Sequence, residues 1–342
     1  MINCAVVGAT GYTGLELARI LLRHSKIKIS GLTTRQNEPI PLRSLLPALP
    51  KEIGLEIKSF DFAGIKQKSD CVFLCLPHTE AMELAKKFLK AGCFVIDLSA
   101  DFRLRNPKVY EEWYGVKHKA PEFLKRAVYG LPEMYRKDIR SADFISNPGC
   151  YPTAATLGLI PLLRRKLIEI DSIVIDAKSG VSGAEKKLTQ ATQFAELDQN
   201  FYAYKVGRHQ HTPEIEQVLT DVAKQKMKVT FTAHLLPVDR GILATIYAKK
   251  KKGVTKGQIQ KAFQEDYAKE PFLRILPEGE FPSLKAVQQT NYCDIGVHVE
   301  EKGDRVIVLS AIDNLLKGAS GQAVQNMNIH FGFAEEEGLK TW

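Results

Sequence analysis

The pattern of apolar and polar positions divides the first part of the chain into short apolar runs that alternate with amphipathic segments. Apolar runs of strand length lie at 2–7, 26–32, 70–76 and 93–98, and helices are expected at 15–22 and 79–90. A further strand is expected near 55–58 and a short last one at 143–146, whereas 106–140 is aromatic, charged and expected to be loop-like. This alternation predicts a doubly wound α/β domain of the Rossmann type.

The second part of the chain predicts a different architecture. The apolar run 154–163 indicates a buried helix, and apolar strands are expected at 172–177, 229–235 and 241–248. We expect an α+β catalytic and oligomerisation domain over 148–314. The first domain would cover 1–147, and a C-terminal segment of about 315–342 would cross back to it.

A glycine-rich turn follows the first strand directly and opens the first helix. Strand, glycine turn and helix form the setting in which a backbone approaches a pyrophosphate at a helix N-terminus. The spacing is GxxGxxG instead of GxGxxG, and a simple tight turn is the alternative. The candidate cofactor residues are Gly8, Thr10, Gly11, Tyr12, Thr13 and Gly14.

The end of the second strand indicates which dinucleotide is bound. An NAD enzyme usually carries an acidic residue here, which holds the ribose 2′-hydroxyl. This chain has Thr34 and Arg35 instead, and an arginine suits a 2′-phosphate. The alternative is a solvated loop arginine. We therefore predict NADP, as NADPH in the reductive direction.

A cysteine ends the polar, turn-forming cluster Ser146–Gly149. Cys150 is expected on a strained loop at the start of the buried helix, where unpaired N–H groups would stabilise its thiolate. A thiolate attacks carbonyl carbon, so the position suits covalent catalysis. The alternative is one more small buried hydrophobic residue.

Two histidines precede a predicted helix start. Thr212 and Pro213 are good N-cap and N1 residues. If the preceding segment is extended, His209 and His211 project to one side, beside a helix N-terminus that disfavours the imidazolium and keeps a base available. An H-x-H pair is also half of a metal site, but no third ligand is apparent.

Two further stretches carry candidate binding residues. The small residues of 178–184, among them Ser182 and Gly183, suit close contact with substrate or nicotinamide, although a flexible loop is the alternative. Arg103 follows the strand 93–98, and an arginine at the carboxyl edge of a sheet can grip a phosphate with two donors. An ordinary ion pair with Asp101 or Glu111 is the alternative for Arg103.

Composition narrows the classes of function. The net charge of +9 indicates anionic partners, but the densest basic run, Lys249–Lys252, precedes a capping-box pair, Thr255 and Gln258, and reads as a solvated turn. We expect neither nucleic-acid binding nor a membrane span. The six cysteines are irregularly spaced without a CxxC pair, which indicates a reducing, cytoplasmic setting and no zinc site.

Several motifs together resemble one enzyme family from residue 8 to about residue 330. Ile145-Ser-Asn-Pro-Gly-Cys-Tyr-Pro-Thr-Ala followed by Gly158-Leu-Ile-Pro looks like the active-site signature of the N-acetyl-gamma-glutamyl-phosphate reductases. The stretches DLSADFRL, H-x-H-x-P-E and Asn-Leu-x-Lys-Gly-Ala are also similar to that family. The resemblance implies Cys150 as nucleophile and a proton-carrying histidine. It also implies substrate contacts from Arg103 (with Arg105 in reserve), Glu214, Ser182 and Gly183, and a cofactor contact from Asn314.

The resemblance implies reduction of N-acetyl-L-glutamyl 5-phosphate to its 5-semialdehyde with NADPH, through a cysteine thioester, in arginine biosynthesis. It further implies a homodimer or homotetramer. The alternatives are the sister reductase whose acyl phosphate is carried by a small acidic protein in lysine biosynthesis, and aspartate-semialdehyde dehydrogenase. A non-enzymatic NADP sensor is the alternative from another class. The sequence leaves open which of His209 and His211 carries the proton.

Overall fold

A computed structural model describes residues 1–184, 186 and 189–340, and it divides the chain into two compact units. The first unit comprises residues 1–148 and 319–340, and the second comprises residues 149–318. Within the described ranges, no helix has both the length and the apolar character needed to cross a bilayer.

The first unit is built on a sheet whose core strands are parallel. Within the described residues this sheet has the order β3-β4-β2-β1-β5-β6-β8-β7, and only the short β3 pairs antiparallel to its neighbour. The predicted Rossmann-type α/β fold is confirmed. The strands are β1 (Ile2–Val7), β2 (Ile27–Thr34), β3 (Ile40–Pro41), β4 (Glu56–Ser59), β5 (Cys71–Leu74), β6 (Phe94–Asp97), β7 (Val128–Tyr129) and β8 (Phe144–Ser146).

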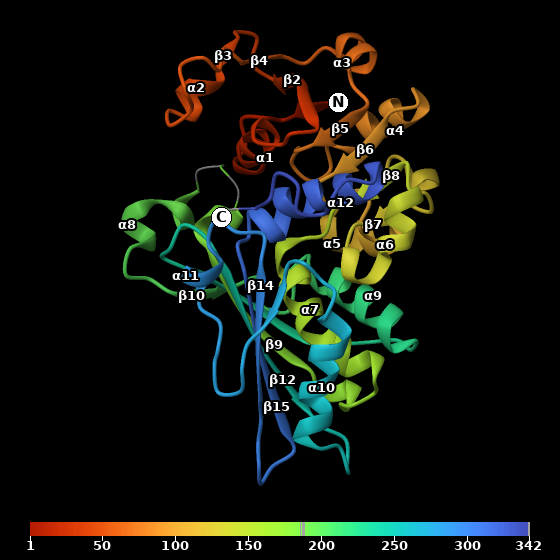
Figure 1. Cartoon of the computed structure of the whole chain (residues 1–342), viewed down its shortest axis with the longest axis vertical. Helices are drawn as coiled ribbons and strands as arrows, with labels where there is room; N and C mark the ends of the chain where they lie inside the picture. Colours follow the sequence, from red (N-terminus) through yellow and green to blue (C-terminus); the bar gives the residue numbers. More distant parts are fainter. Residues whose placement is uncertain (185, 187–188, 341–342) are drawn as a thin grey trace. The chain divides into compact units, whose positions relative to one another are not determined.

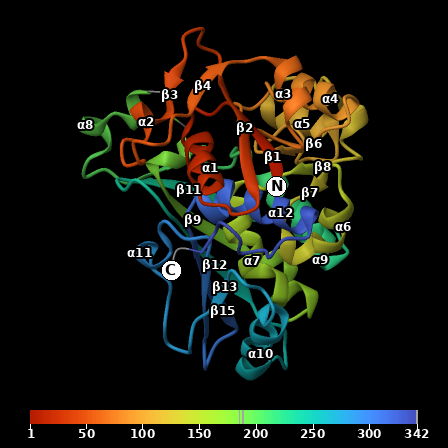
Figure 2. The ribbon, with the colours of Figure 1, turned by 45° about the horizontal axis from the view of Figure 1, so that its top comes forward.

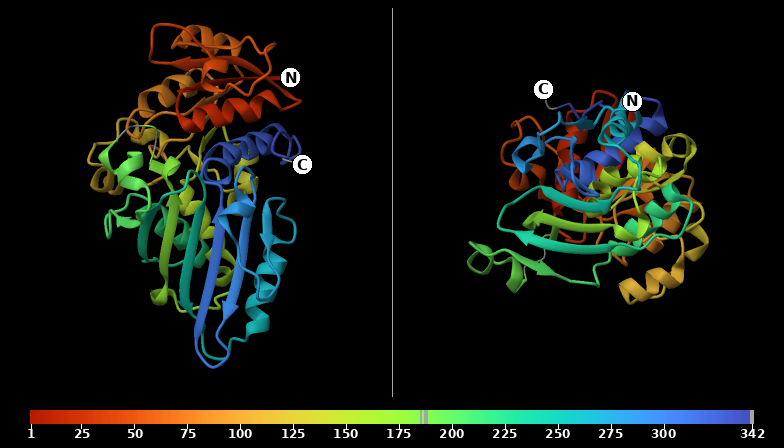
Figure 3. Two further views of the ribbon diagram at one scale, coloured as in Figure 1. Left: turned by 90° about the vertical axis from the view of Figure 1, so that its left-hand side faces the viewer. Right: turned by 90° about the horizontal axis from the view of Figure 1, so that it is seen from below.

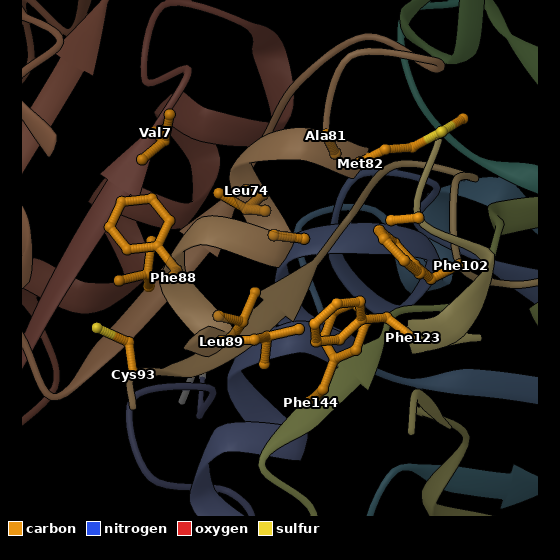
Figure 4. Packing of buried hydrophobic residues seen from close by; sticks show 14 of the residues in the cluster. Val7, Leu74, Ala81, Met82, Phe88, Leu89, Cys93, Phe102, Phe123 and Phe144 are labelled. Carbon is orange, nitrogen blue, oxygen red and sulfur yellow. The ribbon is translucent and has the colours of Figure 1, made fainter. Parts of the chain in front are cut away.

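Helices of the first unit bury one apolar stripe each against this sheet. In α4 the buried positions Met82, Ala85 and Leu89 recur at helical spacing, and Figure 4 shows Leu89 beside side chains of the neighbouring strands. Burying one such leucine stabilises the fold by roughly 1.5–3 kcal/mol. Figure 2 shows α1 beside β1 and β2. The helices are α1 (Tyr12–Leu22), α2 (Leu42–Leu45), α3 (Phe62–Lys68), α4 (Met82–Lys90), α5 (Pro107–Tyr114), α6 (Pro132–Ser141) and α12 (Gly321–Phe331).

The expectation that residues 106–140 form a loop is wrong, because this stretch contains α5, α6 and β7. The side chain of Asn106 caps α5 by accepting the N–H of Lys108 at 2.9 Å, and Pro107 is the first helical residue. Gly115 ends the helix in the left-handed conformation, at φ 71°. Local end signals therefore make a helix here, although the apolar stripe is short.

The second unit contains a mixed sheet in the order β10-β11-β9-β12-β15-β14-β13, counted over the described residues. β9 runs parallel to β11 and antiparallel to β12, and Figures 1 and 3 show the long strands of this sheet side by side. The predicted α+β architecture is confirmed. The strands are β9 (Val174–Gly180), β10 (Tyr202–Tyr204), β11 (Thr230–Leu236), β12 (Ile242–Lys249), β13 (Leu273–Ile275), β14 (Cys293–Val299) and β15 (Arg305–Ile312).

Helix α7 (Cys150–Arg164) forms the centre of the second unit. It is apolar all round, and every residue from Tyr151 to Leu163 is buried. Such a helix must be covered on all sides. One side of α7 lies on β12 and β15, and α9 and α10 pack against its other sides. The remaining helices are α8 (Phe194–Leu197), α9 (Thr212–Ala223), α10 (Lys256–Tyr267) and α11 (Leu284–Val287).

Candidate functional site

Cys150 is the first residue of α7 and is half-buried. The predicted strained loop is wrong, because the preceding Gly149 has an ordinary extended backbone with φ −71° and ψ 156°. A Cβ atom added to Gly318 would lie 2.8 Å from the Cβ of Cys150, so Gly318 packs directly on the cysteine. The helix start thus fixes Cys150 without backbone strain.

A carboxylate from another helix caps this helix start. The Oε1 atom of Glu214 accepts the N–H of Gly149 at 2.8 Å, and Glu214 is 1% exposed. Glu214 lies in the first turn of α9, which begins at Thr212 with His211 as the flanking residue. The predicted N-cap at Thr212 is therefore wrong by one residue. The family resemblance implied a substrate contact from Glu214, which stays a prediction; in the structure Glu214 orders the segment that carries Cys150.

The two histidines meet through a turn. Residues 205–211 form turns in which Lys205 and Gly207 are left-handed, so the expectation of an extended segment is wrong. The rings of His209 and His211 nevertheless lie 5.0 Å apart between centroids, and both approach the ring of Tyr151 edge-on, at 5.3 and 5.9 Å. Tyr151 follows Cys150, so the predicted histidines and the cysteine belong to one cluster.

Two tyrosine hydroxyls connect this cluster, and the sequence reasoning did not single them out. Tyr204 donates to the hydroxyl of Tyr151 at 3.2 Å, and Tyr151 donates to the backbone carbonyl of His234 at 3.1 Å. The Nε2 atom of His209 lies 3.4 Å from the hydroxyl of Tyr204. Burial raises the pKa of Tyr204 to about 12 and raises that of Tyr151 further, so both hydroxyls keep their protons near neutral pH. The only sequence signal was their nearness along the chain to Cys150 and His209.

Ser182, Gly183 and Asn314 come together near the end of β9. The Nδ2 of Asn314 donates to Oγ of Ser182 at 3.0 Å, and its Oδ1 accepts the N–H of Gly241 at 2.8 Å. A Cβ on Gly183 would lie 2.8 Å from Oγ of Ser179. The amide of Asn314 therefore orders the short helical turn Val181–Ala184 that carries Ser182 and Gly183.

The metal alternative for the H-x-H pair finds no support where the chain is described. No group of three or more His, Cys, Asp or Glu side chains suited to a metal ion occurs in residues 1–184, 186 and 189–340.

In the first unit, the glycines of the turn serve different purposes. Gly8 has φ +90°, and a Cβ there would lie 2.2 Å from the carbonyl oxygen of Cys75. A Cβ on Gly14 would lie 2.4 Å from the carbonyl oxygen of Gly8. At Gly11 the nearest atom would be 3.8 Å away, so the fold leaves space there. Gly11 is the N-cap of α1 without a side-chain cap, an arrangement that suits a phosphate at the helix N-terminus.

The end of β2 is hydrogen-bonded through its backbone to the glycine-rich turn. The carbonyl oxygen of Thr33 accepts the N–H groups of Gly8 and Ala9, at 3.1 and 2.8 Å. Thr34 is buried, whereas the side chain of Arg35 is 69% exposed and forms an ion pair with Glu80. Thr34 and Arg35, the predicted 2′-phosphate residues, thus come directly after a residue whose backbone carbonyl is hydrogen-bonded to the predicted pyrophosphate turn. The other candidates, Thr10, Tyr12 and Thr13, lie in this turn and in the first turn of α1.

Arg103 is held by backbone carbonyls. It is 5% exposed, its Nε donates to the carbonyl oxygen of Asn147, and its Nη2 donates to that of Leu98, both at 2.8 Å. Arg105 is exposed. Asp101, a predicted alternative partner, accepts the N–H groups of Thr79 and Ala81. Arg103 therefore orders residues at the carboxyl ends of β6 and β8, and the phosphate-binding role stays a prediction.

Comparison with known proteins gives matches along nearly the whole chain. Residues 3–142 match the family described as "Semialdehyde dehydrogenase, NAD binding domain", and residues 150–314 match "Semialdehyde dehydrogenase, dimerisation domain". A protein named N-acetyl-gamma-glutamyl-phosphate reductase from Desulforudis audaxviator is 49% identical over 99% of this chain and 98% of its own length. One of the same name from Pelotomaculum thermopropionicum is also 49% identical, over 99% and 97%.

Solved structures share the fold at low identity. Aspartate semialdehyde dehydrogenase II from Vibrio cholerae, complexed with ASA, is 15% identical with a TM-score of 0.72 over 97% of this chain and 98% of its own. A probable aspartate-semialdehyde dehydrogenase from Pseudomonas aeruginosa is 20% identical with a TM-score of 0.70, over 96% and 98%. Aspartate semialdehyde dehydrogenase with NADP from Candida albicans is 16% identical with a TM-score of 0.70, over the same shares.

Proposed function

The chain belongs to the N-acetyl-gamma-glutamyl-phosphate reductase family, and from this premise we propose that it reduces N-acetyl-L-glutamyl 5-phosphate to N-acetyl-L-glutamate 5-semialdehyde. The reaction consumes NADPH, releases phosphate and serves arginine biosynthesis. One observation of the structure carries the proposal. A half-buried cysteine opens a helix whose start is ordered by the carboxylate of Glu214, and the rings of two histidines approach Tyr151, the residue that follows the cysteine.

The first unit fits a dinucleotide. The space at Gly11 and the uncapped start of α1 suit the pyrophosphate, while Thr34 and Arg35 suit a 2′-phosphate. In the second unit, Ser182, Gly183 and Asn314 are the candidates for the nicotinamide and substrate. NADPH, when bound, supplies a hydride to the acyl carbon of the substrate. The chain's own residues supply the nucleophile, the orientation and the proton transfers.

The sulfur of Cys150 attacks the acyl carbon of the acyl phosphate. A C–S bond forms, the bond from carbon to the phosphate oxygen breaks, and phosphate leaves with the bonding electron pair. The resulting thioester accepts a hydride more readily than a carboxylate, because resonance stabilises its carbonyl less. After reduction, the C–S bond breaks and returns the thiolate, and one of His209 and His211 supplies and removes the proton on the substrate oxygen. We assign the expelled phosphate to Arg103, with Arg105 in reserve.

Reactivity of the cysteines tests the nucleophile. Burial raises the pKa values of the thiols of Cys71, Cys75 and Cys93, so iodoacetamide should alkylate Cys150 first near neutral pH. Substrate without NADPH should protect Cys150 and leave an acyl adduct on it, visible by mass spectrometry. Cys150→Ser should keep the fold and NADPH affinity but lose turnover. An adduct on another cysteine, or an active serine variant, would contradict the mechanism.

The acyl substrate is tested in the reverse direction. Phosphate-dependent reduction of NADP should proceed with N-acetylglutamate semialdehyde and be negligible with aspartate semialdehyde. Activity with only the aspartate compound, or only with a carrier-linked semialdehyde, would assign the chain to one of the alternatives. If the protein binds NADP but turns over none of these compounds, the alternative of a non-enzymatic NADP sensor would be favoured.

We place oligomerisation in the second unit, because residues 150–314 match a family described as a dimerisation domain. One sheet face, with Ile246 and Val308, packs under α7 at Gly158. Alternating positions of the other face are only partly covered, among them Val174, Leu243, Tyr247, Ile307 and Leu309. We propose that this face packs on a second copy in a homodimer or within a homotetramer. Leu309→Arg should lower the mass in sedimentation equilibrium; an unchanged mass would place the interface elsewhere.

Cytoplasmic location and the absence of nucleic-acid binding stay predictions.

A further inference from the structure

Two residues of the segment 313–318 lie beside the cysteine and the substrate candidates of the second unit. Gly318 packs on Cys150, since a Cβ added to it would lie 2.8 Å from the Cβ and 3.2 Å from the Cα of the cysteine. The amide of Asn314 donates to the hydroxyl of Ser182 at 3.0 Å. The course of this segment therefore determines how closely its backbone approaches Cys150 and where the amide of Asn314 points.

The backbone of this segment takes a conformation that needs support from outside the turn. Residues Leu316–Ser320 form a π-helical turn, which is rare in proteins and is found frequently at functional sites. The Oδ1 atom of Asp313 accepts the N–H groups of Leu315 and Leu316, at 2.8 and 3.1 Å. The backbone carbonyl of Asp313 accepts the N–H of Gly318 at 3.0 Å. One residue thus satisfies three N–H groups of the segment.

The second carboxylate oxygen of Asp313 connects the segment to two other parts of the unit. Oδ2 accepts the N–H of Gln289 at 2.7 Å and lies 3.5 Å from Nη1 of Arg240. Asp313 is 0% exposed, and burial raises the pKa of its carboxyl group, whereas the hydrogen bonds and the charge of Arg240 oppose this rise. A buried carboxylate is tolerated when its oxygens are hydrogen-bonded and its charge is paired. Arg240 is therefore the counter-ion of Asp313.

Arg240 belongs to the connection between β11 and β12, and this connection contacts the same substrate candidates. The carbonyl oxygen of Asp239 accepts the hydroxyl of Ser182 at 2.7 Å and its N–H at 3.1 Å. The N–H of Gly241 donates to Oδ1 of Asn314 at 2.8 Å. The three segments that carry Ser182, Arg240 and Asn314 are therefore joined in one closed network of contacts.

We propose that Asp313 is a positioning residue: paired with Arg240, it fixes the segment that carries Asn314 and Gly318 as one wall of the site beside Cys150. This inference rests on the proposed function of the cysteine. The thiolate itself is stabilised by the backbone N–H groups at the start of α7. A shift of the wall should therefore misplace the substrate while the sulfur stays reactive.

Hydrogen exchange of the intact protein, followed by mass spectrometry, tests the network without any substrate. Asp313→Asn keeps the size of the side chain, but one acceptor oxygen becomes an NH2 group, which faces a donor whichever way the amide is turned. We expect the N–H groups of Leu315, Leu316 and Gly318 to exchange about tenfold faster than in the wild type or more. Unchanged exchange in this variant overturns the inference.

Asp266→Asn is the matched control. The side chain of Asp266 is also nearly buried, at 7% exposure, and it is paired with Arg164 and Arg165. These arginines lie at the end of α7 opposite to Cys150. Asp266→Asn should therefore lower the stability of the unit and leave the exchange of residues 313–318 as it is in the wild type.

Turnover and thiol reactivity separate positioning from stability. For Asp313→Asn we expect kcat to fall by about one to two decades, because a small misplacement of the substrate has a large effect on rate. Alkylation of Cys150 by iodoacetamide should be as fast as in the wild type or faster. Asp266→Asn should unfold at a lower urea concentration and keep the wild-type kcat. If Asp313→Asn behaves like Asp266→Asn, or loses turnover and alkylation in parallel, the inference is wrong.

Two other positions keep the test decisive if Asp313→Asn does not fold. Arg240→Gln leaves the buried carboxylate without its counter-ion and should lower kcat by about tenfold or more. Arg240→Lys keeps the charge and should lose far less turnover. Gly318→Ala places a methyl group against Cys150 and should lower kcat without faster exchange at Leu315. Equal turnover of the two Arg240 variants, or a wild-type kcat in Gly318→Ala, overturns the inference.

The proposed function and this inference can fail separately. If the wild-type enzyme turns over no acyl phosphate, the proposed function fails. The network around Asp313 is then still decided by the hydrogen exchange of Asp313→Asn and Asp266→Asn, which needs no substrate.

Discussion

The carboxylate of Glu214, in the first turn of α9, accepts the backbone N–H of Gly149, the residue immediately before Cys150, at 2.8 Å. Gly149 is the N-cap of α7 and has no side chain to cap the helix, so the carboxylate satisfies one of the free N–H groups at the helix start, that of the N-cap residue itself. The accepting oxygen comes from a distant part of the sequence.

Removing this cap should cost stability. Glu214→Ala leaves a buried N–H without an acceptor, so we expect the free energy of unfolding to fall by about 1–3 kcal/mol. Glu214→Gln keeps an acceptor oxygen and should lose less. Urea unfolding followed by circular dichroism measures both, with Glu301→Ala on the surface as control. A large rise in KM with unchanged stability would instead make Glu214 mainly a substrate ligand.

Two glycines of the turn should respond in opposite ways to alanine. Gly8→Ala forces a Cβ against the carbonyl of Cys75 at positive φ, so the protein should be destabilised by about 1–3 kcal/mol or more. Gly11→Ala meets open space and should keep the fold, while NADPH binding weakens because the methyl group takes ligand space. Thermal unfolding and fluorescence titration separate the two effects. A stable Gly8→Ala variant would show that the turn can rearrange.

The charge of Arg35 should decide between the two cofactors. Arg35→Ala should weaken NADPH binding by one to two decades, the equivalent of roughly 1.5–3 kcal/mol, and leave NADH binding nearly unchanged. Glu80 forms an ion pair with Arg35, so Glu80→Gln should strengthen NADPH binding modestly. Calorimetric titration measures each, with the exposed Arg23→Ala as control. Equal losses for both cofactors would show that Arg35 serves the fold.

His209 should contribute to acid sensitivity. Its pKa is about 3 in the folded protein and about 6.5 in an unfolded chain, so between these values the unfolded state binds more protons. Stability is therefore lost as the pH falls from about 6.5 towards 3. The His209→Gln variant should show a flatter decline in unfolding free energy between about pH 7 and pH 4.5, whereas His298→Gln, on the surface, should not. An unchanged slope would contradict the neutral, buried ring.

Signals that act along the chain could be read from the sequence. The capping box of Thr255 and Gln258 is present at the start of α10, and the glycine turn lies between β1 and α1 as predicted. The helix α5 was missed although Asn106, Pro107 and Gly115 mark its two ends, because its apolar stripe is short. The helix is specified by its end signals and not by apolar periodicity.

Contacts between distant segments could not be read in this way. Tyr151, Tyr204 and the carbonyl of His234 come from α7, β10 and β11, and only the packed sheet brings them together. The turn at residues 205–211 likewise depends on left-handed Lys205, which no local rule predicts for a lysine. Sequence motifs identified the candidate reacting residues, whereas their orientation is a property of the packing.

The two hydrogen bonds that the carbonyl of Thr33 accepts from Gly8 and Ala9 have a consequence for changing the cofactor preference of this enzyme. The segment that would discriminate the 2′-position and the turn that would hold the pyrophosphate share one oxygen atom, so a backbone shift at one is transmitted to the other. A substitution at residue 34 or 35 that shifts this backbone would therefore also displace the turn. An engineered NADH-dependent form should therefore be obtained by transplanting both segments as one unit.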